Sequence, residues 1–184
     1  MKIVGIDASL TSTGIAVINE NNRQETLTIQ SKNTGSERLI EIRKKLLQIV
    51  DDADLVVIED YAFARANQAH QIGELGGVLR VMFHELGLNV LKVAPSAVKK
   101  FATGKGVASK EQMAVAVYKR WGKEFATNDE ADAYTLAIIG QVYFAFTSHD
   151  AEIPTALTAF QKEVIQQLIN GKQTKKKKSN KKGS

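Results

Sequence analysis

The sequence predicts a mixed α/β domain in which helices flank a five-stranded sheet. Three observations support this fold class. The chain opens with three β-rich segments separated by short polar stretches, two further apolar strands each follow a segment of helical spacing, and the remainder has helical spacing throughout. Antiparallel strands followed by strands reached through helical crossovers give a mixed sheet.

The first three strands are predicted to form an antiparallel meander. KIVGIDAS at 2–9 is rich in β-branched residues and indicates a central strand, and TGIAVIN at 13–19 indicates its neighbour. Asn21 and Asn22 supply the turn that leads out of the second strand. ETLTIQSK at 25–32 alternates polar and apolar residues, which predicts a third, more exposed strand.

Two helical crossovers return the chain to the sheet. Ser36 is expected to cap a helix that runs to about Val50, with apolar residues at helical spacing. DLVVIED at 54–60 is a compact apolar run, which is typical of a buried parallel strand. Residues 66–86 predict a long helix that ends at a glycine, and NVLKV at 89–93 predicts the fifth strand.

The rest of the chain is predicted to be mainly helical. Pro95 opens a short helix, the loop TGKGVA follows, and Ser109 caps the helix KEQMAVAVYKRW. Asn128 or Asp129 is expected to cap a helix over EADAYTLAIIGQVYFAF. Residues 155–170 are expected to add one more helix.

Basic charge is concentrated at the end of the chain. Seven of the 25 Lys and Arg residues lie within KQTKKKKSNKKGS at 172–184, so residues 1–171 carry 18 basic and 20 acidic residues. We therefore expect a folded domain over 1–150, a helical extension over 151–171 and a disordered lysine-rich tail over 172–184. Such a cluster is typical of nucleic-acid contact, and a solubilising tail is the alternative.

Composition excludes several kinds of site and location. The chain has no cysteine, which excludes disulfides and zinc–cysteine sites. It has no run of about 18 apolar residues that could span a membrane. Its first residues lack the apolar core of a signal peptide. We therefore expect a cytoplasmic protein with no membrane partner.

Four acidic residues fall where the predicted topology brings them together. Asp7 lies within the first strand, where a charge is unfavourable without a partner. Glu59 ends the fourth strand, which the crossover should return beside the first. Asp129 and Asp132, three residues apart, share one face of a helix. Crowded carboxylates repel one another unless a cation neutralises them, and Mg²⁺ is the usual choice beside phosphate.

Each of these acids also has an ordinary structural interpretation. Asp7 could begin a polar turn in DASLTS, and Glu59 could be a simple strand-end acid. Asp129 is a good helix cap, and Asp132 would then lie in a first turn where the helix dipole favours negative charge. The functional interpretation therefore depends on the four together. Two divalent ions about 4 Å apart held there would promote phosphodiester hydrolysis.

Four motifs in order carry a resemblance to a known family. They are GID with TG-x-A-V, then VVIED-Y-x-F-A-R-x-N, then P-S-A-V-K with K-G-V-A-S-K, and finally ADA preceded by Asp129. From about residue 2 to residue 146 the chain resembles the RuvC-type Holliday junction resolvases of the RNase H-like superfamily. By this resemblance the segment between the acidic motifs holds two functional lysines, Lys99 and Lys110.

The resemblance implies an RNase H-like fold and an endodeoxyribonuclease of DNA recombination and repair. It would resolve Holliday junctions and other branched DNA, leave 5′-phosphates, and cut symmetrically as a homodimer. Two Mg²⁺ ions, for which Mn²⁺ can substitute, would be held by Asp7, Glu59, Asp129 and Asp132, with Lys110 beside the phosphate. Ala8-Ser9 and Asp60 depart from the family pattern, which indicates a divergent, phage-type member.

Further residues are expected to contact DNA. Tyr61 and Phe63 follow Glu59, and aromatic side chains there suit stacking on bases exposed at a branch point, with core packing as the alternative. Contacts to phosphates are expected from basic residues, each of which could instead be an ordinary solvated side chain. They are Arg65, Arg80, Lys99, Lys100, Lys105 and Lys110.

The helix over 66–86 is the expected dimer interface, because apolar residues extend over more than one of its faces. Burial in the monomer's own core is the alternative for the same residues. They are Leu75, Val78, Leu79, Met82 and Phe83.

Rival functions remain open at the level of sequence. GIDASLTSTG also resembles the phosphate-binding strand of sugar kinases and chaperone ATPases, but those need two such domains and about 350 residues. A catalytically inactive module that binds branched DNA is a second alternative, against which the complete acid set argues. An RNase H-like ribonuclease acting on RNA–DNA hybrids is a third, with the same fold and metals.

Overall fold

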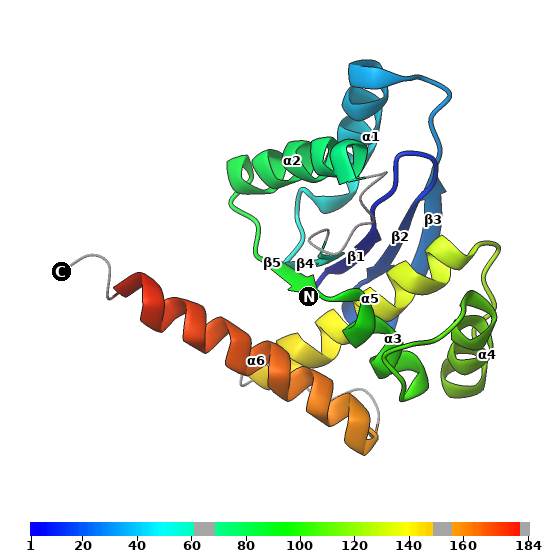
Figure 1. Cartoon of the computed structure of the whole chain (residues 1–184), viewed down its shortest axis with the longest axis vertical. Helices are drawn as coiled ribbons and strands as arrows, with labels where there is room; N and C mark the ends of the chain where they lie inside the picture. Colours follow the sequence, from blue (N-terminus) through cyan, green and yellow to red (C-terminus); the bar gives the residue numbers. More distant parts are fainter. Residues whose placement is uncertain (61–68, 149–155, 181–184) are drawn as a thin grey trace.

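A five-stranded mixed sheet with the strand order β3-β2-β1-β4-β5 forms the centre of the structure (Figure 1). The computed structural model describes residues 1–60, 69–148 and 156–180. β1 pairs antiparallel with β2 and parallel with β4. β2 pairs antiparallel with β3, and β4 pairs parallel with β5. The strands are β1 (Ile3–Asp7), β2 (Thr13–Ile18), β3 (Gln24–Ile29), β4 (Leu55–Glu59) and β5 (Val90–Val93).

This topology confirms the predicted meander and places the first and fourth strands side by side. The connection between β2 and β3 is a short 3₁₀ turn, Glu20–Asn22, in which Asn21 adopts a φ of 64°. Asparagine tolerates this left-handed conformation better than most residues, which explains the turn predicted there.

Helices cover both faces of the sheet (Figure 1). α1 (Gly35–Val50) and α2 (Ala69–Glu85) lie over one face, and α5 (Asn128–Thr147) crosses the other. α3 (Pro95–Thr103), α4 (Lys110–Trp121) and α6 (Ala159–Asn180) lie on the same side as α5. Alternate strand residues therefore enter two separate apolar clusters, with Ile3 in one and Val4 in the other.

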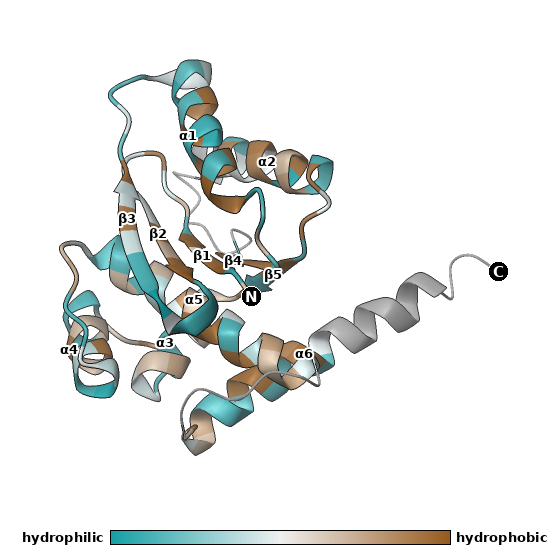
Figure 2. Ribbon diagram, turned by 180° about the vertical axis from the view of Figure 1, so that it is seen from behind, coloured by the Kyte–Doolittle hydropathy of each residue, from teal (hydrophilic) through white to brown (hydrophobic). Residues whose placement is uncertain are grey.

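Hydrophobic residues gather on the strands and on the helix faces turned toward them (Figure 2). α5 is the exception to the usual amphipathic pattern, because both its outward and its inward sides are buried over most of its length. The α3, α4 and α6 layer covers it from outside. A helix that is apolar all round belongs at the centre of a fold, and α5 has that place here.

Two glycines allow α5 to lie unusually close to the sheet. A Cβ atom at Gly5 of β1 would overlap the backbone carbonyl oxygen of Ala133 in α5. In the reverse direction, a Cβ at Gly140 of α5 would overlap side-chain methyls of Val57 and Ile3. Because only glycine fits at either position, helix and sheet are held at one separation.

The structure corrects two predicted helix caps and confirms a third. α1 begins after Thr34 rather than at Ser36, which lies in the first turn. The N-cap of α5 is Thr127, whose hydroxyl accepts a hydrogen bond from the Glu130 N–H, and not Asn128 or Asp129. Ser109 caps α4 in a capping box with Gln112, as its sequence position predicts.

α6 differs from the prediction in its extent. It begins at Ala159 and continues to Asn180, so regular structure extends into the segment expected to be a disordered tail. Lysine is a good helix former, and no proline interrupts residues 159–180, so a helix that starts against the body of the protein can continue. None of the helices in the described part of the chain combines the length and apolar character needed to cross a bilayer.

The close packing of α5 predicts the effect of adding a methyl group. We expect Gly5→Ala to lower the free energy of unfolding by about 3 kcal/mol, because backbone atoms of α5 have nowhere to move. Gly171→Ala in α6 is the matched control, since a Cβ at Gly171 meets nothing within 4 Å. It should stabilise by up to about 1 kcal/mol. Urea unfolding measures both, and equal stability of the two variants would contradict the packing argument.

Candidate active site at the carboxyl ends of the central strands

Asp7 and Glu59 are the last residues of two neighbouring parallel strands. β1 and β4 pair in register up to Ile6 and Ile58, so the next residue of each strand emerges at the same edge of the sheet. The polar turn predicted near Asp7 begins only after it, where the Thr13 hydroxyl donates to the Ser9 carbonyl at 2.6 Å. Asp7 therefore remains a strand residue, next to Glu59, as the topology predicted.

The first turn of α5 brings the second pair of acids to the same edge. Gly14 of β2 pairs in register with Asp7, and a Cβ atom at Gly14 would overlap the carbonyl group of Asp129. The start of α5 therefore rests directly on β2, one strand away from Asp7. Asp132, one turn further along, interacts electrostatically with both Asp7 and Glu59.

These acids and two lysines surround one cavity of about 260 Å³. Lys99 enters from α3, and Lys110 enters as the first residue of α4, just after the Ser109 capping box. Both lysines are thus held by helices whose starts are defined by proline or by a cap. The lining residues are Asp7, Glu59, Pro95, Lys99, Ala108, Ser109, Lys110, Met113, Asp129 and Asp132.

Burial and mutual repulsion raise the affinity of these carboxyls for protons. Burial raises the pKa of Asp7 well above its usual range, and the charges of Asp132, Glu59 and Asp129 raise it further. Burial, with the Asp132 charge, raises the pKa of Glu59 to about 7. Burial also raises the pKa of Asp132 to about 6, against the opposing effect of Lys110.

The donor set fits a hard divalent cation. Four carboxylates supply only oxygen ligands. The raised pKa values of Asp7, Glu59 and Asp132 show that positive charge in their midst is electrostatically favoured. Within the described residues, no three acidic or histidine side chains already stand in the tight arrangement of a single ion site. The four acids line the cavity from the sheet edge and from α5 instead.

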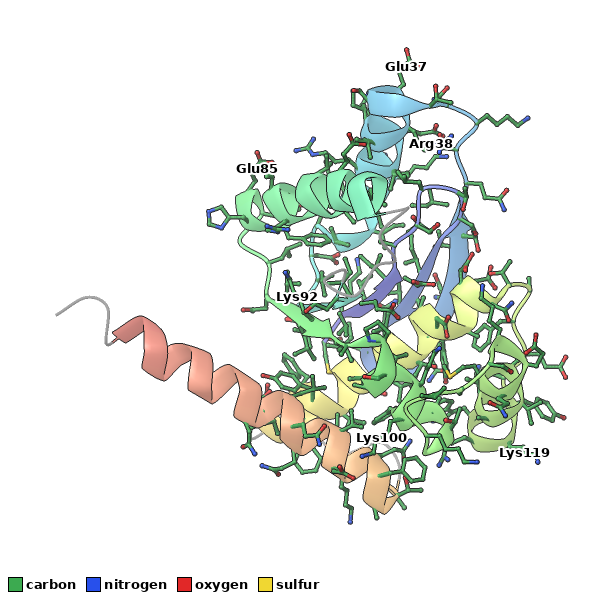
Figure 3. The ribbon with its side chains drawn as sticks, in the orientation of Figure 1. Glu37, Arg38, Glu85, Lys92, Lys100 and Lys119 are labelled. Carbon is green, nitrogen blue, oxygen red and sulfur yellow. The ribbon has the colours of Figure 1, made fainter. Side chains whose placement is uncertain are left out.

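The other basic residues expected to contact DNA are dispersed. Lys100 points toward α6, where its Nζ donates to Glu163 Oε1 at 2.6 Å (Figure 3). Lys105 lines a separate hollow between α3 and α4, together with Lys119, which Figure 3 labels on α4. Arg80 lines a third hollow, beside β5. Tyr61, Phe63 and Arg65 lie outside the described residues.

Sequence reasoning missed three residues that shape the site. Gly14 makes room for Asp129, and Thr28 and Glu130 join the start of α5 to β3 through a hydrogen bond of 2.9 Å. The spacing Thr127-x-x-Glu130 is that of a capping box and could have indicated the true helix start. Nothing in the sequence around Thr28 indicates a partner 102 residues away.

Comparison with known proteins identifies the family. The family model described as crossover junction endodeoxyribonuclease RuvC matches residues 3–140. The chain belongs to the RuvC family. This confirms the resemblance read from the sequence, and the matched span includes all four acids and both lysines of the cavity.

Individual RuvC relatives agree with this assignment. The chain is 28% identical to the RuvC of Synechococcus sp. (strain WH7803) over 150 residues, which are 76% of this chain and 97% of the relative. It is 33% identical to the RuvC of Treponema denticola over 147 residues, 74% of this chain and 83% of the relative.

Solved RuvC structures confirm the predicted RNase H-like mixed fold. Thermus thermophilus RuvC superimposes with a TM-score of 0.63 at 25% identity, covering 80% of this chain and 96% of that one. T. thermophilus RuvC in complex with Holliday junction substrate superimposes with a TM-score of 0.60 at 27% identity, covering 74% and 90% of the two chains.

The raised pKa values predict how stability depends on pH without divalent cations. A carboxyl whose pKa is raised by folding binds protons more tightly in the folded state, so stability falls as pH rises from about 4 through 7. Glu59→Gln should raise the free energy of unfolding at pH 8 by about 1–2 kcal/mol and flatten this decline. Urea unfolding in EDTA at pH 5 and pH 8 measures the effect.

The matched control for this prediction is Glu124→Gln, since Glu124 is an exposed loop residue. It should leave the pH dependence unchanged. If wild type and Glu59→Gln decline equally between pH 5 and pH 8, the raised pKa of Glu59 would be refuted.

Proposed function

We propose that this chain is a metal-dependent endodeoxyribonuclease that resolves Holliday junctions. The observation that supports this most strongly is the cavity in which Asp7, Glu59, Asp129 and Asp132 face Lys99 and Lys110, in a chain of the RuvC family. Its matched relatives carry the name crossover junction endodeoxyribonuclease. T. thermophilus RuvC, to which it is 27% identical, has been solved with a Holliday junction substrate.

In this proposal the four acids bind Mg²⁺, as two ions. Ions held there would activate a water molecule for in-line attack on the scissile phosphate and neutralise charge on the leaving oxygen, giving a 5′-phosphate product. Asp7 and Glu59 are held by the sheet, while Asp129 and Asp132 are held by α5. The close packing of α5 on the sheet limits how far the two pairs of carboxylates can move apart, which favours catalysis by reducing reorganisation.

The lysines have a different role from the acids. Lys110 interacts with Asp7 and Asp132, and Lys99 interacts with Glu59 and Asp132, so each reduces repulsion among the carboxylates. Their ammonium groups also lie where a phosphate entering the cavity would bring its negative charge. We propose that Lys110 stabilises the charge that develops on the phosphate and that Lys99 helps to orient it.

Cleavage assays test this function directly. Labelled four-way junction, fork, flap, linear duplex and RNA–DNA hybrid are incubated with Mg²⁺ or EDTA. We expect Mg²⁺-dependent paired nicks in the four-way junction, and a loss of more than about a hundredfold in Asp7→Asn, because it removes a charge that holds the ions. Lys110→Ala should lose about tenfold to a hundredfold while it retains metal binding.

Glu124→Gln serves as the exposed-acid control and should cut like the wild type. Preferential cutting of the RNA–DNA hybrid would favour the ribonuclease alternative. Junction binding without cutting in any divalent metal would refute the catalytic role of the acids and leave a DNA-binding module.

We further propose that the protein acts as a homodimer through a surface formed by α1 and α2. One face of α2 packs on the sheet and buries four of the residues expected at this interface in the chain's own core. They are Leu75, Leu79, Met82 and Phe83. A shallow groove of about 540 Å³ lies on the other side of α2. Its lining residues are Ser36, Leu39, Ile40, Arg43, Gly77, Val78, Val81 and Glu85.

Two features of this groove favour a second copy as its partner. Ile40 and Val81 are large apolar residues with 52% and 57% of their surface exposed. Gly77 destabilises α2 by about 1 kcal/mol relative to alanine, and a Cβ there would meet nothing within 4 Å. Small residues on a helix allow the backbone of a partner to approach closely, and symmetric junction cutting requires two active sites.

Charge substitutions on the groove test the dimer. We expect Val81→Glu to convert the protein to a monomer, measured by sedimentation velocity, because burying two unpaired carboxylates at a symmetric interface is strongly unfavourable. Val115→Glu on α4 is the control, since Val115 is exposed to a similar extent, 53%. A wild-type monomer, or a dimer that survives Val81→Glu, would contradict the proposed interface.

A further inference from the structure

The first turn of α5 is joined to β3 by a small hydrogen-bond network that lies outside the active-site cavity. Thr28 Oγ1 donates to Glu130 Oε1 at 2.9 Å, and the Ala126 N–H donates to Glu130 Oε2 at 3.3 Å. The Glu130 N–H donates to Thr127 Oγ1 at 3.2 Å. Glu130 thus contacts the strand with its side chain and the helix cap with its backbone.

Thr28, the strand residue of this network, lies in the same cross-strand row as Asp7 of the active site. The strand registers pair Asp7 with Gly14 and Gly14 with Thr28, so the three residues form one row across β1, β2 and β3. The first turn of α5 lies over this row. The Asp129 carbonyl rests on Gly14 in the middle, and Glu130 is bonded to Thr28 at the outer end.

Glu130 is placed to hold the helix and not to serve as a further ligand. It is absent from the residues that line the cavity, and each of its carboxylate oxygens accepts a hydrogen bond from Thr28 or Ala126. Asp129 directly precedes Glu130 in the chain, and Asp132 follows it by two residues. A rotation of this turn would move both of those acids relative to Asp7.

The rest of α5 does not depend on this network. Gly5 and Gly140 hold the helix against the sheet further along, within the apolar core. The end of a helix frays more readily than its centre, so the first turn is the part of α5 that needs a separate support. Loss of the network would therefore loosen this turn without unfolding the protein.

We propose that Glu130 and Thr28 are positioning residues, which set the distance of Asp129 and Asp132 from Asp7 and Glu59 and thereby set metal affinity. This inference rests on the proposed function of the four acids. Groups that orient metal ligands without touching the metal typically change metal affinity by about 10- to 100-fold when they are removed. We expect an effect of that size here.

The test measures Mn²⁺ binding by calorimetry without DNA, alongside junction cleavage and urea unfolding. Thr28→Val removes the hydroxyl donor and leaves the Glu130 charge in place, so any loss of affinity reflects geometry and not charge. Thr28→Val and Glu130→Ala should each weaken Mn²⁺ binding by about tenfold or more. Glu130→Gln retains a carbonyl acceptor for Thr28 but places its NH₂ group against the Ala126 N–H, so it should recover only part of the affinity.

Thr26→Val is the matched control. Thr26 lies on the same strand and the same face as Thr28, two residues earlier, and no hydrogen bond of its hydroxyl occurs in the described part of the chain. It should bind Mn²⁺ like the wild type. Hydrogen exchange should also show faster exchange of the 130–132 amides in Thr28→Val than in Thr26→Val.

The outcomes distinguish this inference from the proposed function. If wild type binds Mn²⁺ and Thr28→Val and Glu130→Ala bind it equally well, the positioning role is overturned while the proposed function stands. Equal losses in Thr26→Val and Thr28→Val would also overturn it, because the effect would then belong to β3 in general. If wild type neither binds Mn²⁺ nor cuts DNA, the proposed function fails and this inference fails with it.

Discussion

The contact between α5 and the sheet is the constraint on which the rest of the structure depends. The backbone of α5 lies so close to the backbones of β1 and β2 that a Cβ atom at Gly5 or at Gly14 would overlap it. This contact has two consequences. It forms the centre of one apolar cluster, and it places the two acids of α5 beside the two acids at the strand ends. Stability and site geometry therefore share one packing interface, so a change that shifts α5 affects both.

Repulsion among the buried carboxylates of the site destabilises the folded protein, and the rest of the fold offsets this cost. Asp7, Glu59 and Asp132 are largely withdrawn from water and repel one another, which raises the pKa of each and disfavours the fully ionised site in the isolated protein. Lys99 and Lys110 offset part of this repulsion. Apolar clusters on both faces of the sheet supply the stability that the site does not, and a divalent cation would convert the same repulsion into binding free energy.

The C-terminal helix adds a support that lies beyond the span matched by the family. α6 packs against α3, where Glu163 pairs with Lys100 and the Phe160 ring lies beside Gly104 and Arg120. α3 carries Lys99 into the active-site cavity, on the residue next to Lys100. The contacts of α6 with Lys100 and Gly104 therefore support the helix that carries Lys99, and the two adjacent lysines face different surroundings.

Sequence by itself determined the order of the elements, the mixed sheet, the neighbouring positions of β1 and β4, and the four acids that would meet. Each follows from local information, namely hydrophobic periodicity, turn residues and the rule that a crossover returns beside its starting strand. Tertiary structure alone decided that Lys100 faces α6 while Lys99 faces the cavity, that most apolar residues of α2 belong to the core, and that Thr28 holds Glu130. These depend on contacts between residues far apart in the chain, and a local pattern does not specify which distant side chain will complete a hydrogen bond or fill a space.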